Sequence, residues 1–229
     1  MTWWTKPLNI MTGVLTIGAA GSLLLATSRA VSDPEPISKK DSVISNWEQY
    51  ANGGVRIGRA DAPITITMFS DIRCHFCRET WGLLRRVQSS QPERIAIVYR
   101  HFPFRGLSLD PPRAGVCAAR QGQMVQMYEK YIANYDSLPK DKEGLEKSLM
   151  PTDWEQLASE GGLHRLSEFR TCMLEKDIPD ELIRDVQAAE GVGVVVVPTL
   201  LVNGTRSVGN PGEVKLGQLI AEATGSGGI

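Results

Sequence analysis

The sequence has no marked excess of charge of either sign. Its 229 residues include 25 lysines and arginines and 26 aspartates and glutamates, which gives a formal net charge of −1. A chain without a basic excess has little with which to displace counterions from phosphate, so nucleic acid is not an expected partner. Internal repeats and low-complexity tracts are also lacking. The length therefore suits one domain of ordinary size with room for an insertion.

Cysteine is scarce as well, with four in the whole chain. A domain of this size can bury a sufficient core without disulfides, so its cysteines need another reason. Two of them, Cys74 and Cys77, lie three positions apart in the stretch DIRCHFCR, directly after the alternating apolar segment 64–70. The other two, Cys117 and Cys172, stand alone. Four cysteines allow three pairings, and the close pair accounts for one of the two bonds.

Charged residues are absent from residues 8–26, which are mainly apolar and follow Lys6. The small residues of Ser28-Arg29-Ala30 have the spacing that a signal peptidase accepts. Residues 1–30 are therefore predicted to be a cleaved signal peptide or an uncleaved membrane anchor, and a buried core helix is the weaker alternative. Lys6 predicts that the remainder lies outside the cytoplasm, in the periplasm or an equivalent compartment. If uncleaved, residues 8–26 would anchor it to the inner membrane.

The rest of the chain reads as an α/β domain interrupted by helices. Residues 31–53 contain prolines, glycines and mixed charges without a period, which predicts a linker. Strands are expected at 64–70 and 95–99 with a helix between them, as in a parallel crossover unit. A β-hairpin is expected over 194–204, because Asn203-Gly204 is a strong turn signal. The predicted organisation is a thioredoxin-like domain in two parts, 54–110 and 192–229, split by a helical insertion over 111–191, in which Gly191 ends the last helix.

The close cysteine pair carries the predicted chemistry. Placed between a strand and a helix, Cys74 would lie at the helix N-terminus, where unpaired N–H groups and the helix dipole favour thiolate over thiol. Thiolate is the nucleophile of disulfide exchange, so Cys74 is the predicted attacker and Cys77, almost one turn later, the predicted resolver. His75 in the spacer could stabilise the Cys74 thiolate, or could be an exposed residue without a role. No cofactor and no metal are required.

Three separated motifs carry a resemblance to a known family. They are residues 58–63 leading to Phe69-Ser70-Asp71 and the cysteine pair, residues 99–103 (YRHFP), and residues 197–204 (VPTLLVNG). Together they resemble the DsbA-like thiol–disulfide oxidoreductases of the thioredoxin superfamily, over about residues 54–222. The resemblance implies a thioredoxin fold with an inserted helical domain. This sequence departs from the best-known oxidases of the family in its His-Phe spacer and in Val197, where threonine is common.

The resemblance also implies roles for single residues. Pro198 should be cis and pack beside Cys74, and the Val197 backbone should pair with a substrate polypeptide, with Phe76 as a further substrate contact. Asp71 occupies a family acidic position and could assist proton transfer or satisfy backbone N–H groups in the turn. An oxidase of this family needs reoxidation, so a membrane partner of the DsbB or vitamin K epoxide reductase type is implied. Its substrates would be exported proteins that contain cysteine.

Cys117 and Cys172 both lie on apolar faces of predicted helices. Outside the cytoplasm a disulfide between them is plausible, and two buried unpaired thiols are the alternative.

Other interpretations of the whole chain stay open at this stage. The same fold could serve a reductase or an isomerase, although residues 31–53 look too short for a dimerisation module. A structural four-cysteine zinc site is disfavoured, because such sites use two close pairs. A redox-inert interaction domain is disfavoured by the intact cysteine pair.

Overall fold

The computed structural model describes residues 42–103, 108–138 and 149–225, all of which belong to a unit that spans Ile37–Ile229. The predicted signal or anchor at 1–30 lies outside the described residues. Within the described ranges, none of the helices has the length and apolar character needed to span a bilayer.

A five-stranded mixed sheet forms the centre of this unit, with strand order β1-β3-β2-β4-β5. The two middle strands, β2 (Ile64–Ser70) and β3 (Ile95–His101), run parallel and are buried along their whole length. Strands that are buried along their whole length are expected where helices cover both faces of a sheet. Three shorter strands extend the sheet in antiparallel pairs: β1 (Val55–Ile57) on β3, β4 (Thr199–Val202) on β2, and β5 (Thr205–Val208) on β4.

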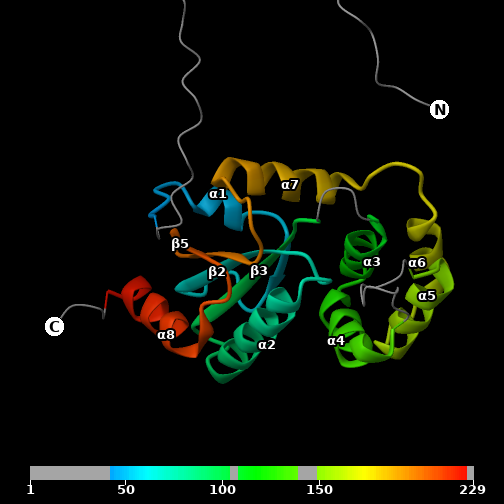
Figure 1. Cartoon of the computed structure of the whole chain (residues 1–229), viewed down its shortest axis with the longest axis horizontal. Helices are drawn as coiled ribbons and strands as arrows, with labels where there is room; N and C mark the ends of the chain where they lie inside the picture. The colour runs from blue at the N-terminus through cyan, green and yellow to red at the C-terminus, as the bar shows by residue number, and fades with distance from the viewer. Residues whose placement is uncertain (1–41, 104–107, 139–148, 226–229) are drawn as a thin grey trace, which may run out of the picture. The chain divides into compact units, whose positions relative to one another are not determined.

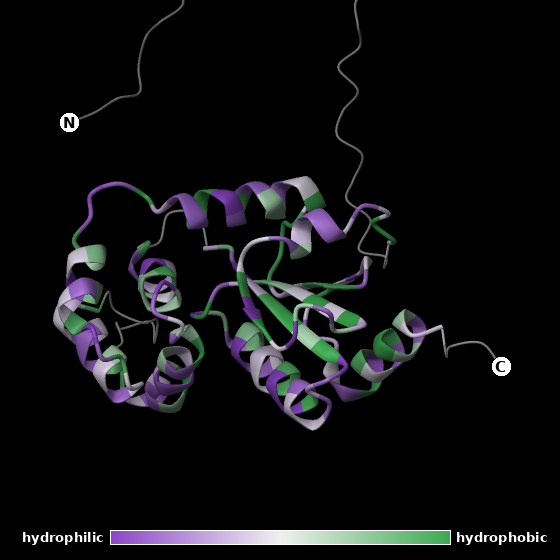
Figure 2. Cartoon of the chain, turned by 180° about the vertical axis from the view of Figure 1, so that it is seen from behind, coloured by the Kyte–Doolittle hydropathy of each residue, from purple (hydrophilic) through white to green (hydrophobic). Residues whose placement is uncertain are grey.

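Helices cover both faces of the sheet (Figure 1). Helices α2 (His75–Ser90) and α8 (Gly212–Ala223) lie on one face, and α1 (Glu48–Ala51) and α7 (Asp180–Val192) lie on the other. Hydrophobic residues concentrate in the strands, whereas the helices alternate between hydrophobic and hydrophilic positions (Figure 2). This is the pattern of one core between a sheet and amphipathic helices.

A helical insertion stands between β3 and α7, beside the sheet (Figure 1). It packs its own buried aromatic residues, among them Tyr131 and Trp154, whose rings stack with centroids 5.4 Å apart. Its elements are α3 (Asp110–Ala119), α4 (Met124–Asn134), the 3-10 helix η1 (Tyr135–Ser137), α5 (Pro151–Glu160) and α6 (Leu166–Met173). The predicted fold, a thioredoxin-like α/β fold with an inserted helical domain, is confirmed.

Three boundaries differ from those predicted. The linker does not extend to residue 53, because α1 forms inside it and Val43 bridges to Thr205 of β5. Helix α7 runs past Gly191 and ends at Val192, and its C-cap residue Gly193 has a positive φ of 72°, which suits glycine. The expected strand at 194 begins only at Thr199. A run of valines favours β structure, but residues 194–197 instead form the loop that leads to Pro198.

A buried polar cluster joins the sheet to the insertion. The Asp185 carboxylate on α7 accepts from Arg100 Nη1 at 2.8 Å and from the His101 backbone N–H at 2.9 Å. It also lies 3.0 Å from His101 Nδ1, while His101 Nε2 lies 3.0 Å from the Tyr128 hydroxyl. A Cβ on Gly115 would come within 2.1 Å of that hydroxyl, so glycine is required there. His101, which belongs to the motif at residues 99–103, is thus a core histidine.

Candidate active site

Cys74 and Cys77 lie where the chain leaves β2 and enters α2, as predicted. Cys74 is the N-cap residue of α2, and its backbone N–H donates to the Asp71 carbonyl at 3.0 Å. The Cys74 side chain is partly exposed, whereas Cys77 is 1% exposed. Both cysteines are reduced in this structure. An accessible sulfur at a helix N-terminus above a buried second sulfur is the arrangement that the attacker and resolver roles require.

The two thiols differ strongly in acidity. A hydrogen bond from the Cys77 thiol, aided by the backbone N–H groups of Cys77 and Phe76, lowers the pKa of Cys74 to about 6, against the opposing effect of burial. Burial, together with the adjacent Cys74 sulfur, raises the pKa of Cys77 far above its ordinary range. At neutral pH Cys74 is therefore mostly thiolate, while Cys77 keeps its proton.

Alkylation of Cys74 in the reduced protein should follow this pKa. Because the pKa is lowered to about 6, the rate should rise as pH increases through 6 and reach a plateau near neutrality. An unperturbed thiol, with a pKa of about 8.5, would still be gaining reactivity at pH 8. Iodoacetamide labelling followed by peptide mass spectrometry checks this, with Cys77 as the internal control that stays unlabelled. A midpoint near 8.5 would contradict the assigned thiolate.

The Val197–Pro198 loop lies against the cysteine pair. The Val197–Pro198 peptide bond is cis, as the resemblance implies, and the Cys74 sulfur lies 3.8 Å from the Val197 carbonyl oxygen. Three apolar side chains are exposed in the loop and the spacer: Val195 (64%), Val196 (50%) and Phe76 (58%). The structure thus places Val197 at the Cys74 sulfur and leaves Phe76 open to solvent, where an extended polypeptide could contact both.

His75 fits the second of the two alternatives predicted for it, an exposed residue away from the Cys74 sulfur. Its side chain is largely exposed, and its Nε2 lies 3.2 Å from Glu79 Oε1, one turn along α2. The groups that stabilise the Cys74 thiolate are the Cys77 thiol and backbone N–H groups, not this imidazole. The imidazole lies along the helix surface toward Glu79, four residues later, so proximity in sequence to Cys74 did not bring the ring to the sulfur.

Residues 71–74 connect β2 to α2 and are called the cysteine loop below. Asp71, at the start of this loop, is a buried carboxylate. Its Oδ2 is 2.6 Å from Arg73 Nη2, and its Oδ1 accepts from the Arg73 backbone N–H at 2.9 Å. Arg73 in turn donates to the Ser108 carbonyl at 2.9 Å, just before α3. These contacts fit the structural one of the two predicted roles, since the carboxylate fixes the turn that presents Cys74.

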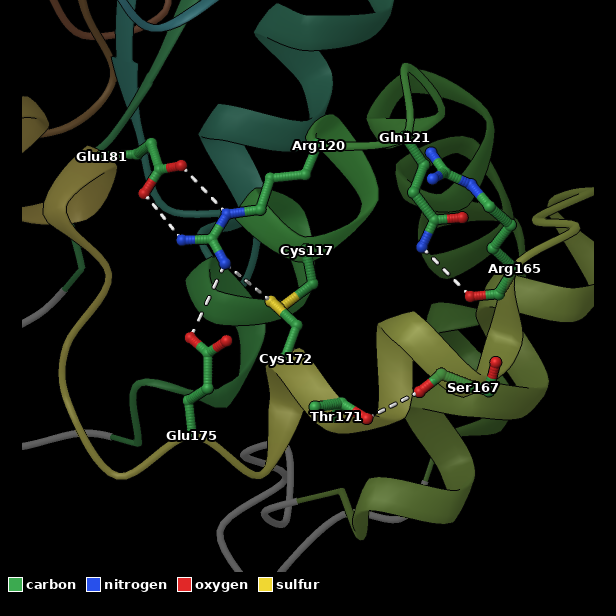
Figure 3. The surroundings of a disulfide bond; sticks show 9 residues. All are labelled: Cys117, Arg120, Gln121, Arg165, Ser167, Thr171, Cys172, Glu175 and Glu181. Atoms are coloured by element: carbon green, nitrogen blue, oxygen red, sulfur yellow. Dashed lines mark hydrogen bonds and ion pairs between the residues drawn. A yellow bond between two sulfur atoms is a disulfide. The ribbon is translucent and has the colours of Figure 1, made fainter.

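Cys117 and Cys172 form a disulfide that joins α3 to α6, with their Cα atoms 5.8 Å apart (Figure 3). Arg120 covers the bridge, with Nη1 3.5 Å from the Cys172 sulfur, and forms ion pairs with Glu175 and Glu181. The predicted zinc alternative is not supported, because two of its four ligands are bonded to each other. The described residues also contain no cluster of three or more metal-ligating side chains.

The pattern of elements and the geometry of the cysteine pair agree with a comparison of sequences. A family profile described as Thioredoxin matches residues 51–222. The chain belongs to this family. The proteins that it resembles include a DsbA structure and a probable disulfide bond formation protein, in agreement with the resemblance to DsbA-like proteins carried by its motifs.

Individual relatives are distant in sequence. A probable disulfide bond formation protein D of Bacillus cereus is 26% identical over 161 residues, which are 68% of this chain and 71% of that protein. The Na(+)/H(+) antiporter NhaA 1 of Mycolicibacterium gilvum is 28% identical over 200 residues, or 83% of this chain. The chain spans only 29% of that antiporter's length.

Solved structures show the same fold. DsbA of Chlamydia trachomatis superimposes with a TM-score of 0.63 at 15% identity, covering 86% of this chain and all of that one. At 15% identity, the likeness to this structure concerns the fold alone.

Proposed function

We propose that the chain is an exported thiol–disulfide oxidoreductase that introduces disulfides into cysteine-containing exported proteins, as a DsbA-like oxidase. The observation that carries this proposal is the position of Cys74, a partly exposed sulfur at the N-cap of α2 beside the buried Cys77 thiol, and this position lowers the pKa of Cys74 to about 6. Stabilising the thiolate stabilises the reduced form of the pair, and a pair with a stable reduced form is a strong oxidant.

The proposed reaction begins with the Cys74–Cys77 disulfide. A substrate thiolate attacks the Cys74 sulfur, forming a substrate–Cys74 bond and releasing Cys77, which takes up a proton because burial raises its pKa. A second substrate thiolate then attacks the first substrate sulfur and releases Cys74 as a thiolate. The substrate loses two electrons and gains a disulfide, and the enzyme gains those two electrons as a dithiol.

Substrate would bind along the Val197–Pro198 loop. Val195 and Val196, just before Val197, and Phe76, in the spacer after Cys74, are exposed and offer apolar contacts. Extended, unfolded polypeptides present both apolar side chains and free backbone groups, so they suit this surface better than folded proteins do.

Reoxidation would require an electron acceptor. We propose a membrane protein of the DsbB or vitamin K epoxide reductase type in this role, in the periplasm or an equivalent compartment, on the strength of the family resemblance and the apolar segment 8–26. If that segment stays uncleaved, it would hold the enzyme at the inner membrane beside its partner.

Oxidation of a reduced, unfolded ribonuclease tests the direction of transfer. The chain with an oxidised Cys74–Cys77 pair should introduce disulfides stoichiometrically, and the same chain with that pair selectively reduced is the matched control. A chain that instead only reduces insulin disulfides would be a reductase of the same fold, and the oxidase proposal would be wrong.

A further inference from the structure

Arg78 connects the cysteine loop to the helical insertion. It follows Cys77 directly, and its backbone N–H donates to the Cys74 carbonyl at 3.0 Å in the first turn of α2. Its side chain turns back toward the loop before Cys74. There Nη1 donates to the Ile72 carbonyl at 3.2 Å and to the Arg73 carbonyl at 2.5 Å. These are the two residues that immediately precede the nucleophile.

The other side of the same guanidinium lies on an aromatic ring of the insertion. Arg78 Cζ is 3.4 Å from the centroid of the Tyr135 ring, in η1. Tyr135 contacts Tyr131 with ring centroids 5.9 Å apart, and Tyr131 stacks on the buried Trp154. The guanidinium is thus held between loop carbonyls and an aromatic group that is itself anchored in the insertion core.

From these contacts we propose that Arg78 is a positioning residue for disulfide exchange, which holds the loop so that the N–H groups of α2 point at the Cys74 sulfur. This inference rests on the proposed function and deepens it. The backbone N–H groups of Phe76 and Cys77 stabilise the thiolate only if Cys74 stays at the N-cap. Fixing the carbonyls of residues 72 and 73 restricts the backbone on the other side of that position.

The shape of the arginine side chain matters as well as its charge. A planar guanidinium can stack on a ring while one of its edges donates to carbonyl oxygens, and a lysine ammonium offers no such plane. Arg78→Lys therefore keeps the charge and removes the stacked, two-carbonyl geometry. Arg78→Gln removes both. Comparing the two variants separates positioning from simple electrostatic attraction.

A matched control lies on the same helix. Arg85 also joins α2 to the insertion, with Nε 3.3 Å from Glu129 Oε1 on α4, and its Cζ lies 5.9 Å from the Trp81 ring centroid. It makes these contacts away from the loop before Cys74. Arg85→Gln therefore removes a similar link between the same two elements and should leave the cysteine loop as it is.

The experiment measures the pH profile of Cys74 alkylation and the equilibrium of the Cys74–Cys77 pair with glutathione, in the full chain and its variants. We expect both Arg78→Lys and Arg78→Gln to lower the thiolate-to-thiol ratio of Cys74 at pH 6 by roughly threefold or more, which corresponds to about half a pKa unit. The equilibrium should move in the same direction, toward a less oxidising pair. Tyr135→Leu should act likewise, and Arg85→Gln should match the wild type.

Two results would overturn the proposal. If only Arg78→Gln changed the profile, charge alone would explain the effect, and unchanged profiles in both variants would mean that Arg78 positions nothing. Thermal unfolding of each variant guards against misfolding as the cause, with Arg78→Lys as the variant expected to fold normally. The alkylation profile does not depend on substrate oxidation, so failure of the proposed oxidase activity would be seen separately, in the wild type.

Discussion

Replacement of Cys74 by serine should abolish disulfide transfer, whereas replacement of Cys77 by serine should trap substrate on the enzyme. The reason is the difference in access and acidity between the two sulfurs. Cys74 is partly exposed and mostly thiolate at neutral pH, so every exchange step passes through its sulfur. Cys77 is buried beneath it and serves only to close or release the bond.

Mixed disulfides trapped on Cys74 can be detected directly. Incubation of the Cys77→Ser variant with an unfolded disulfide-containing protein should accumulate mixed disulfides, seen as adducts on a non-reducing gel that disappear on reduction. Cys74→Ser under the same conditions should give no adduct. Adducts formed through Cys77 would reverse the assigned roles, and full cellular function in Cys74→Ser would favour a redox-inert interaction domain.

Loss of the Cys117–Cys172 bridge should cost about 4 kcal/mol in the free energy of unfolding, from the chain entropy of a closed loop of this size. The two cysteines are separated by 55 residues, and the bond ties α3 to α6 within the insertion. A Cys117→Ala, Cys172→Ala double variant, unfolded in denaturant beside the wild type, measures the difference. Alanine avoids leaving a buried hydroxyl without a partner.

The same double variant should keep its disulfide chemistry. The bridge and the Cys74–Cys77 pair belong to different elements, so alkylation of Cys74 should show an unchanged pH profile. An unchanged free energy of unfolding would mean that the bridge does not form in the purified protein. A loss of Cys74 reactivity would mean that the insertion core supports the active site more closely than the loop contacts indicate.

The sequence predicted the features that local patterns encode. Apolar residues alternate along β2 and run without interruption over residues 95–99 of β3, and both patterns predict strands. The turn Asn203-Gly204 has a conformation that few residue pairs adopt, and a cysteine pair at a strand–helix junction has a defined chemistry. These features placed Cys74 at the start of a helix, whereas the cis Pro198 in the loop beside Cys74 was implied by the family resemblance. Each depends on residues that are close in sequence.

The features that sequence did not predict depend on contacts between distant residues. Arg100 and His101 owe their burial to Asp185, which is 84 or more positions away. Strand β1 has only three half-buried residues, too few for a period to be recognised. The position of His75 next to the nucleophile favours a role in stabilising the Cys74 thiolate, but the side chain of His75 turns to Glu79.

The Cys74–Cys77 pair is proposed to oxidise its substrates. The redox equilibrium of this pair with glutathione tests the proposal most directly. A thiolate stabilised at a pKa of about 6, below the value of about 7 in thioredoxin, predicts a reduction potential above that of thioredoxin. Quantifying the reduced fraction by alkylation across glutathione ratios gives the potential. A value near thioredoxin's, about −270 mV, would contradict the account and make the protein a donor of electrons to its substrates.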